Sequence, residues 1–281
     1  MTRRKWPTVG LAMIVKDGVP DELRRCLASI APHVDKIALV DTGPLGDSGR
    51  IVAAEFKAIY VHDPQWYDPA TSYIRDFAAP RNLSFSLLDT DWLVWADHDD
   101  VVDGAENIRK LITEQPDDVG GIQCPYIYAR DEYGNATTMH HRERILRASV
   151  GWKWEGRIHE SIIPQSVMRW EESDEVIWTH EAESRDKSDR NLPMLHKWLE
   201  EEPDNLRLLL HLGNQYYAHG EHKTAAEWYT RFYTGLGGAP HDRYQAMTYA
   251  ARSLRIINNV KEAIRADSAA ILEFPELADG Y

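Results

Sequence analysis

The chain has 281 residues, of which 43% are hydrophobic and 27% are charged, a composition that excludes an intrinsically disordered protein. The formal net charge of −13 disfavours a nucleic-acid-binding protein and an anionic membrane surface, because both partners attract basic residues. No apolar stretch approaches the ~20 residues of a membrane span, and we find no signal peptide. We therefore expect a cytoplasmic protein that does not associate with membranes.

The first third of the chain alternates between apolar runs and helical patterns. Residues 8–15 (TVGLAMIV), 36–40 (KIALV) and 58–61 are short apolar runs, typical of strands buried on both faces. Residues 20–30 and 50–56, which lie between them, have apolar side chains at helical spacing. This order of elements predicts a parallel sheet with helical crossovers, and therefore an α/β domain.

A fourth apolar run leads into a group of acidic residues. After a polar loop at 62–74, residues 77–88 predict a helix and residues 92–96 (WLVWA) predict a buried strand. The sequence DHDD at residues 97–100 follows that strand directly. Beyond it we expect a helix at 105–113. Three later segments have the composition of strands at the edge of a mixed sheet: residues 121–128, 143–146 and 176–179.

The last third of the chain is helical and resembles tetratricopeptide repeats. The best match has the characteristic order of large and small residues: Leu209, Leu212, Gly213, Tyr216, Gly220, Ala225, Tyr229 and Phe232. The small residues allow two helices to approach closely, and the tyrosines fill the space between them. We predict an α/β domain over residues 1–185 and a helical repeat domain over residues 186–281.

The DHDD motif indicates a metal site. In an open α/β sheet, ligands bind beyond the carboxyl ends of the strands, and this is where Asp97 and Asp99 are expected. Carboxylates at positions i and i+2 can reach one Mg²⁺ or Mn²⁺ ion, which in turn holds phosphate oxygens. The alternative is a structural turn whose aspartates cap a helix.

The order of several motifs resembles family 2 glycosyltransferases, which have the GT-A fold. The matching segments, in chain order, are LAMIVKD (residues 11–17), DTGPLGDS (41–48), APRN (79–82) and DWLVWADHDD (91–100). The resemblance is to the subgroup joined to tetratricopeptide repeats, which includes bacteriocin S-glycosyltransferases and related peptide or protein glycosyltransferases. It implies a Rossmann-like, mostly parallel sheet, a UDP-sugar as donor, and Mn²⁺ or Mg²⁺ as cofactor.

The resemblance also implies roles for residues on the donor side. Lys16 and Asp41 would contact the nucleotide, and Asp97 would lie near the ribose and the metal. Asp99 would be the direct metal ligand. Arg81 would brace the acidic motif or the diphosphate, although it also fits a helix-surface arginine paired with a nearby acid.

A second segment, WKWEGRIHE at residues 152–160, preceded by Arg142 and Arg144, resembles the part of these enzymes that completes the site. It makes Glu160 the candidate general base, with His159 as the alternative. Trp152 and Trp154 would line the sugar or acceptor pocket, but they fit a simple core equally well. His180 would be a third metal ligand, although the glycine that usually follows it is absent.

These inferences predict an inverting glycosyltransferase with a peptide or protein acceptor, since helical repeats offer surfaces that bind extended chains. Self-association through the helical domain is also compatible with this organisation. A modified DNA base or a glycan remains an alternative acceptor, because residues 142–157 include a run of basic side chains. Two further alternatives are a nucleotidyltransferase and a non-catalytic scaffold. The sequence contains neither GxGxxG nor GxxxxGK, which disfavours dehydrogenases and P-loop enzymes.

Overall fold

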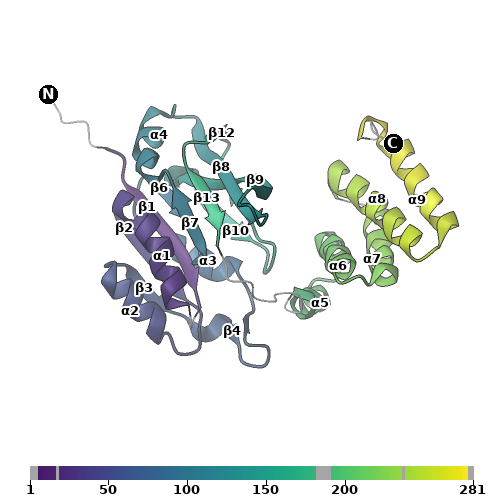
Figure 1. Ribbon diagram of the computed structural model, residues 1–281, viewed down its shortest axis with the longest axis horizontal. Coiled ribbons are helices and arrows are strands. Elements are labelled where there is room, and N and C mark those ends of the chain that lie inside the picture. The colour runs from purple at the N-terminus through teal and green to yellow at the C-terminus, as the bar shows by residue number, and fades with distance from the viewer. Residues whose placement is uncertain (1–5, 17–18, 182–190, 236–237, 278–281) are drawn as a thin grey trace. The chain divides into compact units, whose positions relative to one another are not determined.

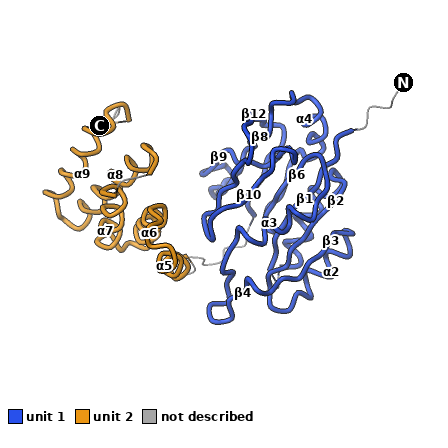
Figure 2. Tube along the Cα trace, turned by 180° about the vertical axis from the view of Figure 1, so that it is seen from behind, with its two compact units in different colours: residues 1–185 blue, residues 186–281 orange. Residues whose placement is uncertain are grey.

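The computed structural model describes residues 6–16, 19–181, 191–235 and 238–277. The chain forms two compact units, residues 1–185 and residues 186–281 (Figure 2). The predicted junction between residues 185 and 186 falls outside the described residues.

A mixed sheet is the centre of the first unit, and nine strands pair in it within the described residues (Figure 1). Four strands run parallel in the order β3-β2-β1-β6, with these bounds: β1 Val9–Val15, β2 Lys36–Asp41, β3 Ile59–His62 and β6 Trp92–Trp95. The order continues β9-β8-β13-β7, and β12 also pairs with β8. These strands are β7 Asp100–Asp103, β8 Val119–Arg130, β9 Ala136–Arg147, β12 Arg169–Glu172 and β13 Ile177–His180. The predicted α/β class is thus confirmed.

Alternate side chains of β1 enter different layers of the core, because successive residues of a strand point to opposite faces. Leu11 and Met13 pack in a cluster with residues of three helices: α1 Pro20–Ile30, α2 Asp47–Glu55 and α4 Ile108–Glu114. Ala12 packs in a second cluster with residues of α3 Ala78–Ser86 and of a hairpin, β10 Trp152–Glu155 and β11 Ser161–Pro164. The sheet is therefore covered on both faces, as its apolar strands require.

The region after the acidic motif contains more strands than the sequence predicts. β9 begins at residue 136 rather than 143, because its outer half is polar and exposed and pairs with β8 as a long hairpin. β7 begins on Asp100 itself, a residue type that strands disfavour. The predicted helix at 105–113 becomes a 3₁₀ turn, Ala105–Asn107, followed by α4. The polar loop at 62–74 includes a 3₁₀ turn, Pro64–Trp66, and a small hairpin, β4 Tyr67–Asp68 and β5 Tyr73–Ile74.

The second unit consists of helices in which each packs against the next (Figure 1). Their bounds are α5 Asn191–Glu201, α6 Leu206–Ala218, α7 His222–Thr234, α8 Pro240–Ile256 and α9 Val260–Glu273. A 3₁₀ turn, Pro275–Leu277, follows α9. The helical C-terminal region is therefore confirmed. No helix among the described residues combines the length and the apolar character that crossing a membrane requires.

A close approach between α6 and α7 depends on one glycine. A Cβ atom on Gly213 would lie 2.6 Å from the ring of Tyr229, too short for any real contact. The ring cannot easily move, because Tyr229 is fully buried and its hydroxyl donates to Asn214 Oδ1 at 2.8 Å. The helices can therefore pack at this distance only with glycine at position 213.

We predict that Gly213→Val lowers the free energy of unfolding of the helical unit by about 2 kcal/mol or more, because the added side chain overpacks the α6–α7 contact. Urea unfolding followed by circular dichroism measures this. Ala218→Val is the matched control, since Ala218 is exposed on the same helix and its substitution should change stability by less than about 0.5 kcal/mol. Equal effects of the two substitutions would contradict the packing argument.

Candidate active site

The acidic motif forms a tight turn between β6 and β7. The backbone N–H of Asp100 donates to the Asp97 carbonyl at 3.1 Å. In the opposite direction, the backbone N–H of Asp97 donates to Asp100 Oδ2 at 3.0 Å. These two hydrogen bonds close residues 97–100 into what we call the acidic turn, at the carboxyl end of β6.

Strand pairing brings His180 to the acidic turn from far along the chain. β13 pairs antiparallel with β7, so that His180 lies opposite Asp100. His180 Nδ1 is 3.6 Å from Asp99 Oδ1, and the imidazole stacks on the Tyr128 ring with a centroid separation of 5.1 Å. One potential ligand atom from each of Asp99, Asp100 and His180 lies within 4.8 Å of the others. We call these three residues the ligand cluster.

The ligand cluster fits a hard divalent cation. Carboxylate oxygens suit both Mn²⁺ and Mg²⁺, and the imidazole favours the transition metal Mn²⁺ of the two. Asp100 Oδ1 is buried and has no hydrogen-bond partner within the part of the chain that the structure describes, a costly arrangement without a cation. Burial, together with the neighbouring Asp97 and Asp99, raises the pKa of Asp100, and the nearby Arg144 offsets only part of this.

Arg81 connects the acidic turn with Glu160. Its Nη2 donates to Asp97 Oδ1 at 2.6 Å, and its Nε donates to Glu160 Oε1 at 2.8 Å. The Arg81 side chain is only 7% exposed, so that water screens neither ion pair strongly. Burial opposes ionisation of Asp97, but the charges of Arg81 and Arg144 outweigh it and lower the pKa of Asp97. Asp97 thus forms an ion pair with Arg81, and the third member of the ligand cluster, beside Asp99 and His180, is Asp100.

Two tryptophan rings form the wall behind Arg81. Its guanidinium carbon lies 5.1 Å from the Trp95 ring and 5.0 Å from the Trp154 ring. These rings meet edge to face at 4.9 Å. Asn82 fixes the backbone of Trp154, donating to its carbonyl at 2.9 Å and accepting from its N–H at 2.8 Å. Trp154 is therefore a core residue beneath the site.

Trp152 lies farther along the same strand. Its indole N–H donates to the Arg147 carbonyl at 2.9 Å, and its ring packs against Trp170 at 5.4 Å. The structure thus gives the two tryptophans different surroundings, and only Trp154 contacts Arg81.

The loop between β10 and β11, residues 156–160, carries His159 and Glu160. Gly156 has φ of 99° and His159 has φ of 53°, in the left-handed region that a histidine seldom adopts. The Phe77 N–H donates to the Arg157 carbonyl at 2.9 Å, which attaches the loop to the start of α3. An open pocket of about 310 Å³ adjoins the loop, lined by Arg142, Glu143, His159, Glu160, Ser161 and Ile162. The base candidates therefore border space that a substrate can enter.

Lys16 and Asp41 lie at the same edge of the sheet, at the carboxyl ends of β1 and β2. Asp41 is fully buried, and it accepts from the Gly43 N–H at 2.8 Å and from the Tyr60 hydroxyl at 3.1 Å. Lys16 Nζ donates to the Ser72 carbonyl at 2.6 Å, which ties β1 to the β4–β5 hairpin. The Asp41 carboxylate therefore stabilises the backbone conformation of the turn at residues 41–43.

Three residues of the site have contacts that the sequence did not predict. No role was expected for Asn82 and no ligand role for Asp100, and Arg144 was expected in the second half of the site but without a named partner. Arg144 lies on β9 with no exposed side-chain surface, and its Nη1 donates to Asp100 Oδ2 at 3.1 Å. An arginine directly before the apolar pair Ile145-Leu146 of a predicted strand was the available signal. Its partner, however, depends on which strands pair.

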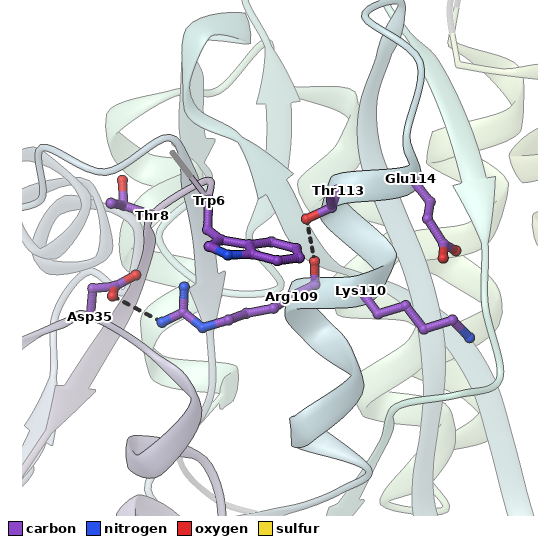
Figure 3. Close-up of a pocket in the computed structure, with 7 residues that line it drawn as sticks. All are labelled: Trp6, Thr8, Asp35, Arg109, Lys110, Thr113 and Glu114. Atoms are coloured by element: carbon purple, nitrogen blue, oxygen red, sulfur yellow. Dashed lines mark hydrogen bonds and ion pairs between the residues drawn. The ribbon is translucent and has the colours of Figure 1, made fainter. Parts of the chain in front are cut away.

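Figure 3 shows the lining of a larger pocket, of about 630 Å³, which contains no residue of the acidic turn. It is found at the amino ends of β1 and β2, and it is lined by Trp6, Thr8, Asp35, Arg109, Lys110, Thr113 and Glu114. Arg109 there pairs with Asp35 at 2.9 Å, as Figure 3 shows. Ligands of open α/β sheets bind at the opposite edge, so we do not assign the active site here.

No protein-family model matches the chain. A TPR repeat-containing protein of Synechococcus elongatus is 24% identical over 94% of this chain and 66% of its own length. An uncharacterized protein of Mycobacterium tuberculosis is 25% identical over 51% of this chain and 36% of its own length. The chain thus spans less than two thirds of these relatives.

Solved structures of glycosyltransferases also resemble parts of the chain. A mannosyltransferase from Pyrobaculum calidifontis, in complex with GDP-Man and Mn²⁺, is 13% identical with a TM-score of 0.47, covering 96% of this chain and 81% of its own. Glucosyl-3-phosphoglycerate synthase from Mycobacterium tuberculosis, in complex with Mn²⁺ and UDP-glucose, is 16% identical with a TM-score of 0.33, covering 43% of this chain and 44% of its own.

We predict that Arg81→Met lowers the free energy of unfolding by about 3 kcal/mol, because Asp97 and Glu160 would lose their shared cation. This is the lower end of the range for a buried pair, since Asp97 is 30% exposed and water can solvate it. Urea unfolding monitored by tryptophan fluorescence measures the loss. Arg24→Met is the control: Arg24 also contacts two acids, but it is 39% exposed, and its loss should have little effect on stability. Similar losses in the two variants would mean that the ion pairs of Arg81 with Asp97 and Glu160 stabilise the fold no more than exposed ion pairs do.

Proposed function

We propose that residues 1–185 form a metal-dependent glycosyltransferase domain that uses a nucleoside-diphosphate sugar, with a UDP-sugar as the first candidate. The observation that carries this proposal is the ligand cluster at the carboxyl end of β6, next to an arginine that links Asp97 of the acidic turn to Glu160. A divalent cation bound there would stabilise the negative charge of the departing diphosphate. The order of the motifs along the chain supports the same activity.

Different residues around Arg81 would bind the cation, the nucleotide and the acceptor. Asp99, Asp100 and His180 would hold the cation, and Asp97, fixed by Arg81, would face the ribose. Lys16 and the turn supported by Asp41 would contact the rest of the nucleotide. Trp154 would pack against Arg81 and hold its guanidinium in place, whereas Trp152 would line the acceptor side.

Glu160 would be the general base of an inverting transfer. The acceptor atom attacks the anomeric carbon, the bond from that carbon to the diphosphate oxygen breaks, and Glu160 takes the acceptor proton. Glu160 Oε1 accepts from Arg81, which fixes the carboxylate and leaves Oε2 as the atom that would receive the proton. His159, on the exposed side of the same loop, is the alternative base or an acceptor contact.

We propose a peptide or protein as the acceptor, with residues 186–281 as the domain that binds it. Consecutive packed helices form extended surfaces suited to polypeptide chains. The net charge of −13 favours such an acceptor over nucleic acid.

We predict that the protein releases UDP from a UDP-sugar only with Mn²⁺ or Mg²⁺, and that Asp99→Ala abolishes this release by removing a cation ligand. A coupled UDP assay across a panel of UDP-sugars measures it. Asp103→Ala, an exposed aspartate four residues away on β7, should retain wild-type turnover. Wild-type rates in the Asp99 variant would exclude the metal site. Pyrophosphate release from a sugar phosphate and UTP would instead indicate a nucleotidyltransferase.

We also predict that Glu160→Gln lowers the transfer rate by roughly 100-fold or more while the donor still binds, because an amide cannot accept the acceptor proton. Single-turnover transfer to the acceptor gives the rate, and isothermal titration with UDP and Mn²⁺ gives donor-side affinity. Glu155→Gln, an exposed glutamate of the same hairpin, is the control. Unchanged transfer in the Glu160 variant would shift the base assignment to His159.

A further inference from the structure

Arg144 occupies a closed cage of aromatic rings. Its guanidinium carbon lies 3.8 Å from the ring centroid of Trp95 on β6, 4.5 Å from that of Tyr126 on β8 and 5.5 Å from that of Trp178 on β13. The side chain has no exposed surface. Three strands thus converge on one guanidinium group, and cation–π contact replaces the water that it loses.

The cage directs the guanidinium toward the acidic turn. Nη1 donates to Asp100 Oδ2 at 3.1 Å and to the Trp95 carbonyl at 3.3 Å. Asp100 Oδ2 also accepts the backbone N–H of Asp97, the bond that closes the turn. Arg144 therefore reaches the turn through Asp100, and the turn presents Asp99.

Burying the charged Arg144 side chain costs more free energy than burying an apolar side chain at the same position. Its Nε and Nη2 are buried without a hydrogen-bond partner among the described residues, and a buried ion pair seldom stabilises more than an apolar side chain would. A positively charged group at this position is understandable if it must fix the orientation of one carboxylate. Groups that orient metal ligands through hydrogen bonds have this function in metal sites generally.

We propose that Arg144 is a positioning residue: through Asp100 it holds the acidic turn in the geometry that binds a divalent cation. This inference rests on the proposed function, since it assumes that the ligand cluster binds the cation. Arg144 itself does not contact the substrate or the metal in this proposal.

Mn²⁺ binding by the protein alone, measured by the loss of the free-ion signal in electron paramagnetic resonance, tests the inference without any turnover. We expect Arg144→Met to weaken Mn²⁺ affinity by about 10- to 100-fold, the range found when supporting residues of metal sites are removed. Arg144→Lys keeps the charge but not the planar group, and it should recover part of the affinity. Circular dichroism and thermal unfolding establish that each variant is folded at the assay temperature.

Arg147→Met is the matched control. Arg147 lies on the same strand, 4.5 Å from the Trp92 ring, and donates to the carbonyls of Val119 and Pro116. It does not contact the acidic turn, so its loss should lower the melting temperature and leave Mn²⁺ affinity within about twofold of wild type.

Wild-type Mn²⁺ affinity in the folded Arg144→Met variant would overturn the inference and leave the proposed function intact, because the arginine would then be only a core residue. An Arg144→Met variant that loses stability and keeps its affinity, as the Arg147 control should, would overturn it in the same way. If the wild-type protein itself does not bind Mn²⁺, the proposed metal site fails, and the role of Arg144 fails with it.

Discussion

The candidate site depends on how buried charges at the end of β6 are balanced. Asp97, Asp99, Asp100 and Glu160 carry four formal negative charges, while Arg81 and Arg144 carry two positive ones, so these six side chains sum to −2. Carboxylates away from water are costly unless they are paired. The two arginines contact Asp97, Glu160 and Asp100, and Asp99 lies beside His180. A divalent cation would balance the remaining charge, so that cation binding would stabilise the folded site.

Trp95 couples the two arginines to the sheet. It ends β6 just before the acidic turn, and its ring lies 5.1 Å from the Arg81 guanidinium carbon and 3.8 Å from that of Arg144. Its indole N–H donates to the Glu143 carbonyl on β9, which fixes the ring. An aromatic ring can lie against a guanidinium without offering a carboxylate-like acceptor, so Arg81 still donates to Asp97 and Glu160, and Arg144 to Asp100 and the Trp95 carbonyl. This explains why two tryptophans of the WLVWA and WKWEG segments surround the site, although Trp154 faces no open space.

The parts of the fold that could be predicted from the sequence are those that local patterns of apolar residues determine. The strands β1, β2, β3 and β6 are nearly continuous apolar runs, and the prediction of a parallel α/β sheet followed from them. β7 and the outer half of β9 were missed, because the first starts on an aspartate and the second is polar and held by pairing alone. The same limit applies to the site. Asp100 meets His180 through the β7–β13 register, and Arg144 meets Asp100 from β9; such long-range pairings are invisible in local composition. Which aspartates can share an ion therefore required the fold.

The two halves of the site lie on different structural layers, and Arg81 is the contact through which the acidic turn and Glu160 meet. The acidic turn and β13 belong to the central sheet, whereas Glu160 lies on a hairpin loop attached to α3. The hairpin packs on the sheet through Trp154. Asn82, the residue after Arg81 on α3, makes two hydrogen bonds with the backbone of Trp154. Helix α3 therefore sets the separation of the two carboxylates: Arg81 holds both, and Asn82 holds the strand that leads to one of them. Because a misplacement of about 1 Å between reacting groups can slow a transfer 100-fold, rigid spacing by one buried helix is a physical requirement for the proposed chemistry.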